Sequence, residues 1–181
     1  MPPEDKPLEI ELVSSAELCA GMVAAYVCRR IAHRAGTYAP GIHEHVFTSL
    51  RRYEFGSTID GVTNWFHAAS GDLFALGYKL CARRVAFRTP LIERWVGGGN
   101  GYRAAVMTTD GNAFHESRIR SGDTAHAVGL LLPTSPLKKP KLELVDPWPG
   151  VEHVRQADDR LEPAHRSRKY GTVLVFWTGH S

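Results

Sequence analysis

The clearest hydrophobic pattern lies near the N-terminal end of the chain. Apolar residues recur there every three or four positions, which is the spacing of one face of an α-helix. Ser14 followed by Glu17 forms a capping-box pattern, and Gly36 supplies a stop signal. The pattern therefore predicts a helix that begins either near Ser14 or later, near Leu18, and runs to about His33.

The pattern changes after the glycine-rich break at residues 97–101. Short runs rich in Val, Leu and Ala follow, and they predict strands at 102–108, 124–132, 141–146 and 172–178. The second and third of these runs are joined by a Pro- and Lys-bearing turn, so they predict a β-hairpin. The charged run 151–169 predicts a short helix or a surface loop.

Further helices are predicted in the first half of the chain. Residues 45–53 predict a short helix, and 62–84 predict a helical stretch interrupted near Gly71, whereas 87–96 fit either a helix or a strand. A helical half (about 14–96) followed by a sheet half (about 102–179) is typical of an α+β fold, in which an antiparallel sheet packs on a long helix. We expect one domain over residues 1–181.

Composition narrows the classes of function. The chain is 43% hydrophobic and 23% charged, as in ordinary globular proteins. Its net charge of +3 is carried by scattered Lys and Arg residues, which disfavours a nucleic-acid partner. No apolar run is long enough for a membrane span, and the N-terminal residues lack signal-peptide character. The three Cys and nine His residues have no zinc-site spacing, so no metal or cofactor is predicted.

Three side chains could together perform acyl-transfer chemistry. Cys19 falls near the start of the predicted helix, where a helix N-terminus stabilises a thiolate. His126 opens one strand of the predicted hairpin and Asp146 ends the other, so the carboxylate could orient the imidazole. Each residue alone also has a structural interpretation, as a buried thiol, a core histidine or a turn residue. We expect Cys28 and Cys81 to be core residues.

At these positions the chain resembles the papain-like cysteine peptidases, in which a Cys heading the central helix meets a His and an Asp or Asn from the sheet. Leu-Cys-Ala-Gly-Met at 18–22 is similar to the helix start of the YopT-type bacterial effector peptidases. Ala-His-Ala-Val at 125–128 and Val-Asp-Pro-Trp-Pro-Gly at 145–150 are similar to their His-Ala and Asp-Pro-Asn-x-Gly segments. The peptidase domains of bacteriocin-exporting transporters share this order and are the second likeness. The resemblance spans roughly residues 14–179.

The resemblance implies a papain-like fold and a cysteine protease that hydrolyses peptide bonds. Cys19 would be the nucleophile that forms a thioester acyl-enzyme, His126 the general base and then acid, and Asp146 the orienting carboxylate. The resemblance further implies a bacterial effector or toxin. Such a protein is cytoplasmic in its producer and is delivered by a specialised secretion system into a target cell. Its partners would be a protein or peptide substrate from that cell and a cognate immunity protein or chaperone.

One feature of the family's pattern is missing from this chain. Papain-like enzymes place an oxyanion-hole Gln a few residues before the Cys, but the only Gln here is Gln156. The backbone N–H of Cys19 and the hydroxyl of Ser14 or Ser15 are the candidates to replace it. Three alternatives therefore stay open: an amidase or deamidase acting on peptidoglycan or on glutamine side chains, an inactive papain-like binding domain, and an unrelated α+β binding protein.

Overall fold

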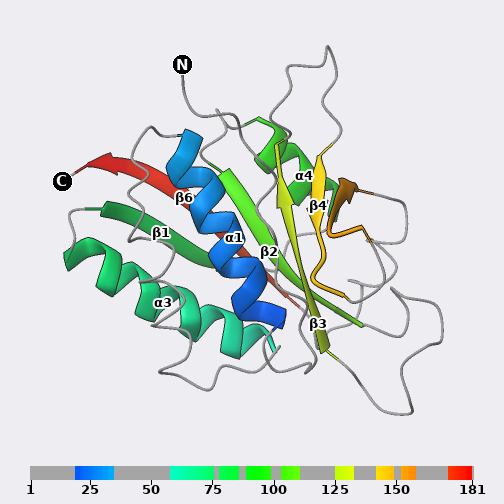
Figure 1. Cartoon of the computed structure of the whole chain (residues 1–181), viewed down its shortest axis with the longest axis horizontal. Helices are drawn as coiled ribbons and strands as arrows, with labels where there is room; N and C mark the ends of the chain where they lie inside the picture. The colour runs from blue at the N-terminus through cyan, green and yellow to red at the C-terminus, as the bar shows by residue number, and fades with distance from the viewer. Residues whose placement is uncertain are drawn as a thin grey trace.

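A computed structural model describes residues 19–34, 58–75, 78–85, 89–98, 103–110, 125–132, 142–148, 152–157 and 171–180. Within these ranges it contains three helices and six strands (Figure 1). In chain order they are α1 (Cys19–Arg34), α3 (Ile59–Ala75), β1 (Tyr78–Val85), α4 (Thr89–Gly97), β2 (Arg103–Asp110), β3 (Ala125–Leu131), β4 (Glu143–Val145), β5 (Val154–Gln156) and β6 (Thr172–His180).

The six strands form one sheet in the order β1-β6-β2-β3-β4-β5, and every neighbouring pair is antiparallel. This combination of helices with an antiparallel sheet confirms the α+β class. The registers that matter for function lie at the β2–β5 end of the sheet. There Thr109 lies opposite His126, Gly129 lies opposite Val145, and Leu144 lies opposite Arg155.

Helices cover both faces of the sheet, with α1 and α3 in front of it in Figure 1 and α4 behind. Residues alternate between the two faces along a strand. On β3, Ala127 and Leu131 pack into the core beneath α1 and α3, whereas Val128 and Leu130 pack into the core beneath α4. The face under α1 and α3 and the face under α4 therefore have separate hydrophobic cores.

Helix α1 approaches β3 closely at a glycine. A Cβ atom on Gly129 would lie 3.0 Å from a methyl carbon of Val23 and 3.0 Å from one of Val27. Since that distance is tighter than ordinary carbon–carbon contact, the absence of a side chain lets the helix lie directly on the strand. The contact fixes the height of α1 along β3.

The structure corrects part of the prediction for the first half of the chain. The predicted helix over 62–84 is wrong beyond Ala75, because residues 78–85 form strand β1 and pair with β6. Among residues 79–85, whose burial is described, Leu80 alone is buried, and such a short apolar run does not distinguish a strand from a helix. Most of the ambiguous segment 87–96 belongs to helix α4, and the prediction of a helix or loop over 151–169 is wrong at strand β5.

Other predictions agree with the structure or lie outside the residues it describes. The described part of helix α1, Cys19–Arg34, lies within the predicted helix, and both predicted starts, near Ser14 and near Leu18, lie outside the described residues. The strands predicted at 102–108, 124–132, 141–146 and 172–178 correspond to β2, β3, β4 and β6. The short helix predicted at 45–53 lies outside the described residues. Among the described helices, none combines the length and the apolar character needed to cross a membrane.

Candidate functional site

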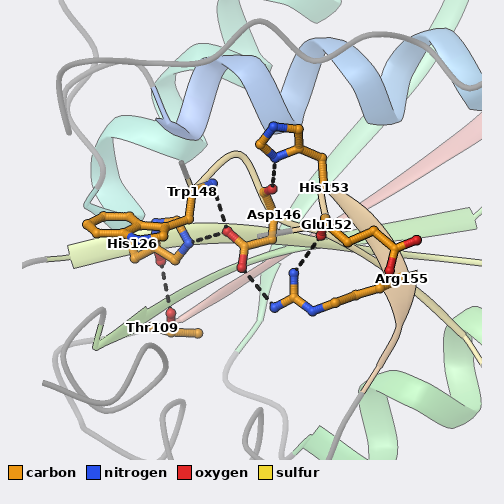
Figure 2. A network of polar contacts seen from close by, with 7 residues as sticks. All are labelled: Thr109, His126, Asp146, Trp148, Glu152, His153 and Arg155. Carbon is orange, nitrogen blue, oxygen red and sulfur yellow. Dashed lines mark hydrogen bonds and ion pairs between the residues drawn. The ribbon is translucent and has the colours of Figure 1, made fainter. Parts of the chain in front are cut away.

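The structure brings together the two side chains of the predicted hairpin. Nε2 of His126 lies 2.7 Å from Oδ1 of Asp146, within hydrogen-bonding distance. Both residues are buried, with 1% of His126 and 0% of Asp146 exposed. A carboxylate can only accept, so Nε2 carries the proton of this bond. The hydrogen bond therefore fixes both the tautomer and the orientation of the imidazole (Figure 2).

Asp146 accepts two further hydrogen bonds. Nη2 of Arg155, from β5, donates to Oδ2 over 2.9 Å, and the backbone N–H of Trp148 donates to Oδ1 over 3.0 Å. The two carboxylate oxygens therefore have separate partners, with Arg155 on one and His126 and Trp148 on the other. A buried anion requires this kind of compensation, because an unpaired charge in the interior is costly.

The backbone of Asp146 is bound on both sides by one residue. Its N–H donates to the carbonyl of His153 over 2.8 Å, and its carbonyl accepts from Nδ1 of His153 over 2.8 Å. The first of these bonds continues the pairing of β4 with β5 beyond the last residue of β4. Together the two bonds hold the backbone of Asp146 in place, and this fixes the direction in which its side chain leaves the main chain.

The imidazole is also enclosed by its neighbours. The ring of Trp148 meets the ring of His126 edge to face, with centroids 5.5 Å apart and an interplanar angle of 85°. The hydroxyl of Thr109 donates to the backbone carbonyl of His126 over 3.2 Å. The T-shaped contact is a favourable aromatic geometry and packs the Trp148 ring against the imidazole.

Strand alternation defines the face on which this network lies. His126 shares a face with Val128 and Leu130, which belong to the core beneath α4. Asp146 follows β4 two residues after Leu144, a member of the same core, and Arg155 lies directly opposite Leu144. The network therefore lies on the α4 face, at the end of the sheet where β3 begins, and α1 packs on the other face.

Cys19 is the first described residue of α1, and its side chain lies outside what the structure describes. Figure 1 shows α1 and β3 running in the same direction, with both starting at the same end of the sheet. Cys19 lies one turn, about 6 Å, before Val23, and His126 lies about 10 Å before Gly129. Because Val23 touches Gly129, the start of the helix is close in height to His126.

The other predicted site residues lie outside the described part of the chain, and the other two cysteines differ in burial. Ser14 and Ser15 lie outside the described residues. Cys28 is 1% exposed, as expected for a core residue, and this burial raises the pKa of its thiol far above the ordinary value. Cys81 lies on the edge strand β1 and is only partly buried, so the prediction of a fully buried residue is wrong there.

Two members of the network were missed from the sequence. Arg155 falls in the charged run 151–169, which reads as a solvated surface because its acids and bases are mixed. Trp148 lies in the Val-Asp-Pro-Trp-Pro-Gly segment, and no pattern in the sequence links its ring to His126. The useful indication was local: Asp146-Pro147-Trp148 fixes a turn whose third N–H points back to the carboxylate, in the manner of an Asx turn.

The described site orients an imidazole through a buried hydrogen bond to a carboxylate. This is the arrangement that orients the base of a catalytic triad. In the described part of the chain, no three His, Cys, Asp or Glu side chains gather in a way that could hold a metal ion. No model of a known protein family matches the chain, and a search of characterised proteins finds no significant sequence match.

Proposed function

We propose that the protein is a papain-like cysteine peptidase that hydrolyses peptide bonds through a Cys19–His126–Asp146 triad. The observation that carries the proposal is the buried 2.7 Å bond between Nε2 of His126 and Asp146. A histidine bonded to a fully buried carboxylate that has two further donors is the arrangement that orients the base of a catalytic triad. Burying such a group costs folding free energy unless every partner is present.

The position of Cys19 supports its role as nucleophile. The first turn of a helix presents unpaired backbone N–H groups and the positive end of the helix dipole, both of which favour a thiolate. Cys19 is the first described residue of the helix that lies on β3, and β3 carries His126 near its own start. Cys28 cannot serve, because burial in an apolar environment keeps its thiol protonated.

The reaction follows from these roles. The sulfur of Cys19 attacks the carbonyl carbon of the substrate while His126 holds the thiol proton on Nδ1. The tetrahedral intermediate collapses to a thioester, the C–N bond breaks, and the proton passes from Nδ1 to the leaving amine. Water then attacks the thioester carbon while Nδ1 of His126 takes one of its protons. The C–S bond breaks, the carboxylic acid product leaves, and the proton passes from Nδ1 back to the sulfur of Cys19. Asp146 stays ionised and bonded to Nε2 throughout.

The developing oxyanion needs donors that the family's Gln would supply. In this proposal the backbone N–H of Cys19 and the hydroxyl of Ser14 or Ser15 take that role. Removing one such donor costs about two to three orders of magnitude in rate in other enzymes. Replacing both serines with Ala should therefore slow hydrolysis without preventing alkylation of Cys19, since alkylation forms no oxyanion.

The resemblance to effector peptidases supports the biological part of the proposal. A bacterial effector or toxin would be made in the producer's cytoplasm and secreted into a target cell, where its substrate is a protein of that cell. A chaperone or immunity protein would keep it inactive in the producer.

Selective alkylation of Cys19 tests the proposal. Wild type, Cys19→Ala and Cys81→Ala proteins are treated with limiting iodoacetamide between pH 5 and 9, and the modified residue is identified by mass spectrometry. We expect Cys19 to react at least tenfold faster than Cys81 near pH 6, because a stabilised thiolate persists below the ordinary thiol pKa. Casein cleavage should be lost in Cys19→Ala and retained in Cys81→Ala.

One observation favours a second candidate, a papain-like domain that binds without catalysis. The imidazole lies on the α4 face, opposite the face on which α1 packs. In this case Cys19 and Cys81 would be alkylated at similar rates at every pH. If Cys19 is selectively alkylated but casein survives, assays with peptidoglycan fragments and glutamine-bearing peptides separate an amidase or deamidase from a peptidase.

A further inference from the structure

Arg155 makes the contact that most distinguishes this site from a simple histidine–carboxylate pair. Its Nη2 lies 2.9 Å from Oδ2 of Asp146, and its Nη1 lies 2.9 Å from the backbone carbonyl of Glu152. The guanidinium is therefore held at two points, one of which does not depend on the carboxylate (Figure 2). Only 17% of the Arg155 side chain is exposed, so this charge is much less screened than that of a surface arginine.

The sheet directs Arg155 toward the site. Arg155 lies opposite Leu144 in the pairing of β4 with β5, so the two side chains share one face of the sheet. Asp146 comes two residues after Leu144 in the chain and therefore lies on the same face. Because β5 is an edge strand, the arginine lies at the outer margin of the network and His126 at the inner one. The order across the sheet is His126, Asp146, Arg155.

We infer that Arg155 is a positioning residue for His126, acting through Asp146. The inference rests on the proposed function and adds a fourth member to its triad. The terminal torsion of an Asp side chain is soft, with a broad distribution of angles, so the bond from Trp148 alone leaves the carboxylate free to rotate. The charge-assisted bond from Arg155 to Oδ2 stops this rotation and holds Oδ1 toward Nε2 of His126.

Arg155→Gln and Arg155→Lys test the inference. The Gln side chain removes the charge and retains a donor, whereas Lys retains the charge and loses the planar fork. Arg84→Gln is the matched control, because Arg84 pairs with Asp60 on the exposed surface between α3 and β1. The first readout is the nitrogen NMR spectrum of the His126 ring, which reports the fraction of the Nε2–H tautomer. The second is the rate of Cys19 alkylation.

We expect the Gln variant to lose its single tautomer and to react about 10–100-fold more slowly at Cys19, the range typical for loss of a group that orients a site residue. The Lys variant should fall between it and wild type, and the Arg84→Gln control should match wild type. A folded Gln variant with an unchanged His126 spectrum would overturn the inference. If the Gln variant does not fold, an unchanged spectrum in the Lys variant would overturn it equally.

These readouts separate the two proposals. If wild-type Cys19 shows no selective alkylation while the Gln variant still loses its tautomer, the proposed function fails and Arg155 remains the residue that orients His126. If Cys19 is selectively alkylated in wild type and in the Gln variant at the same rate, with unchanged spectra, the function stands and the inference fails.

Discussion

Two acidic residues lie close together at β4, on opposite faces of the sheet, and their surroundings differ. Glu143 faces α1 and makes one long contact, 3.4 Å from Nη2 of Arg30. Asp146 faces the α4 side and accepts hydrogen bonds of 2.7, 2.9 and 3.0 Å. The side chain of Glu143 is 19% exposed, whereas that of Asp146 is fully buried. The same short segment thus holds a loosely paired acid and a tightly bound one.

The difference indicates what each acid does. Arg30 also lies over the ring of Tyr26, at 5.9 Å from its centroid, so its pairing with Glu143 attaches the C-terminal half of α1 to the sheet. That attachment tolerates a range of geometries. Asp146 instead has every oxygen assigned to a donor and its backbone fixed by His153. An acid held so closely serves to fix the position of another group, and that group is His126.

Asp146→Ala should have the largest effect and gives the most direct test of this comparison. The substitution leaves Arg155 buried without its partner and removes the acceptor for His126, so we expect a loss of about 3–5 kcal/mol in the free energy of unfolding. Urea denaturation followed by circular dichroism measures it. A loss below about 1 kcal/mol would contradict the view that the network is fully desolvated.

Gly129→Ala tests the opposite face, where packing and not charge dominates. The new Cβ would meet Val23 and Val27 at 3.0 Å, and overpacking of this kind typically costs about 1–3 kcal/mol. Gly71→Ala is the control, since a Cβ there meets nothing and alanine favours the helix. We expect Gly129→Ala to lower the melting temperature and Gly71→Ala to leave it unchanged or raise it.

Glu143→Gln should cost about 1 kcal/mol or less in the free energy of unfolding, because the lost ion pair is long and partly hydrated. The variant retains the size of the side chain, so the measurement isolates its charge. A cost equal to that of Asp146→Ala would show that the two acids are equivalent and would remove the basis of the comparison. Adding salt should reduce the effect further.

The smallest expected effect concerns the thiol of Cys28 in the core beneath α1. Burial raises its pKa in the folded state, so only the unfolded chain loses this proton as the pH rises past the ordinary thiol value. The contribution of this thiol to the free energy of unfolding is therefore fully present below that pH and declines above it. The loss is about 0.4 kcal/mol when the pH equals the pKa of the unfolded thiol. Cys28→Ala should show a flatter dependence of unfolding free energy on pH between 7 and 9.5 than wild type does.

The hairpin and its histidine–carboxylate contact could be predicted because their cause is local. Two apolar runs with a turn between them define the pair β3–β4, and the ends of that pair bring His126 to Asp146. Their catalytic role stays a prediction. Helix α1 could also be predicted from the sequence, since its apolar residues recur with helical spacing and Cys19 falls near its predicted start.

The face on which His126 lies could not be predicted. Strand β3 is buried on both sides, so its Ala, Val and Leu residues form a continuous apolar run with no polar alternation to mark the two faces. Only Gly129, which admits α1, breaks that symmetry. Arg155 was hidden for a related reason, because β5 has three residues and its burial is only partial.

The closeness of Asp146 and Arg155 along the chain, nine positions apart, has a consequence for assembly. The carboxylate, the Trp148 amide, the His153 backbone and the guanidinium all belong to the β4–β5 hairpin, so they can come together with little loss of chain entropy. The β4–β5 hairpin would then hold the carboxylate and its donors in place before β3 adds the imidazole of His126. Transplanting this short segment beside a histidine on another antiparallel sheet is a practical route to an oriented base.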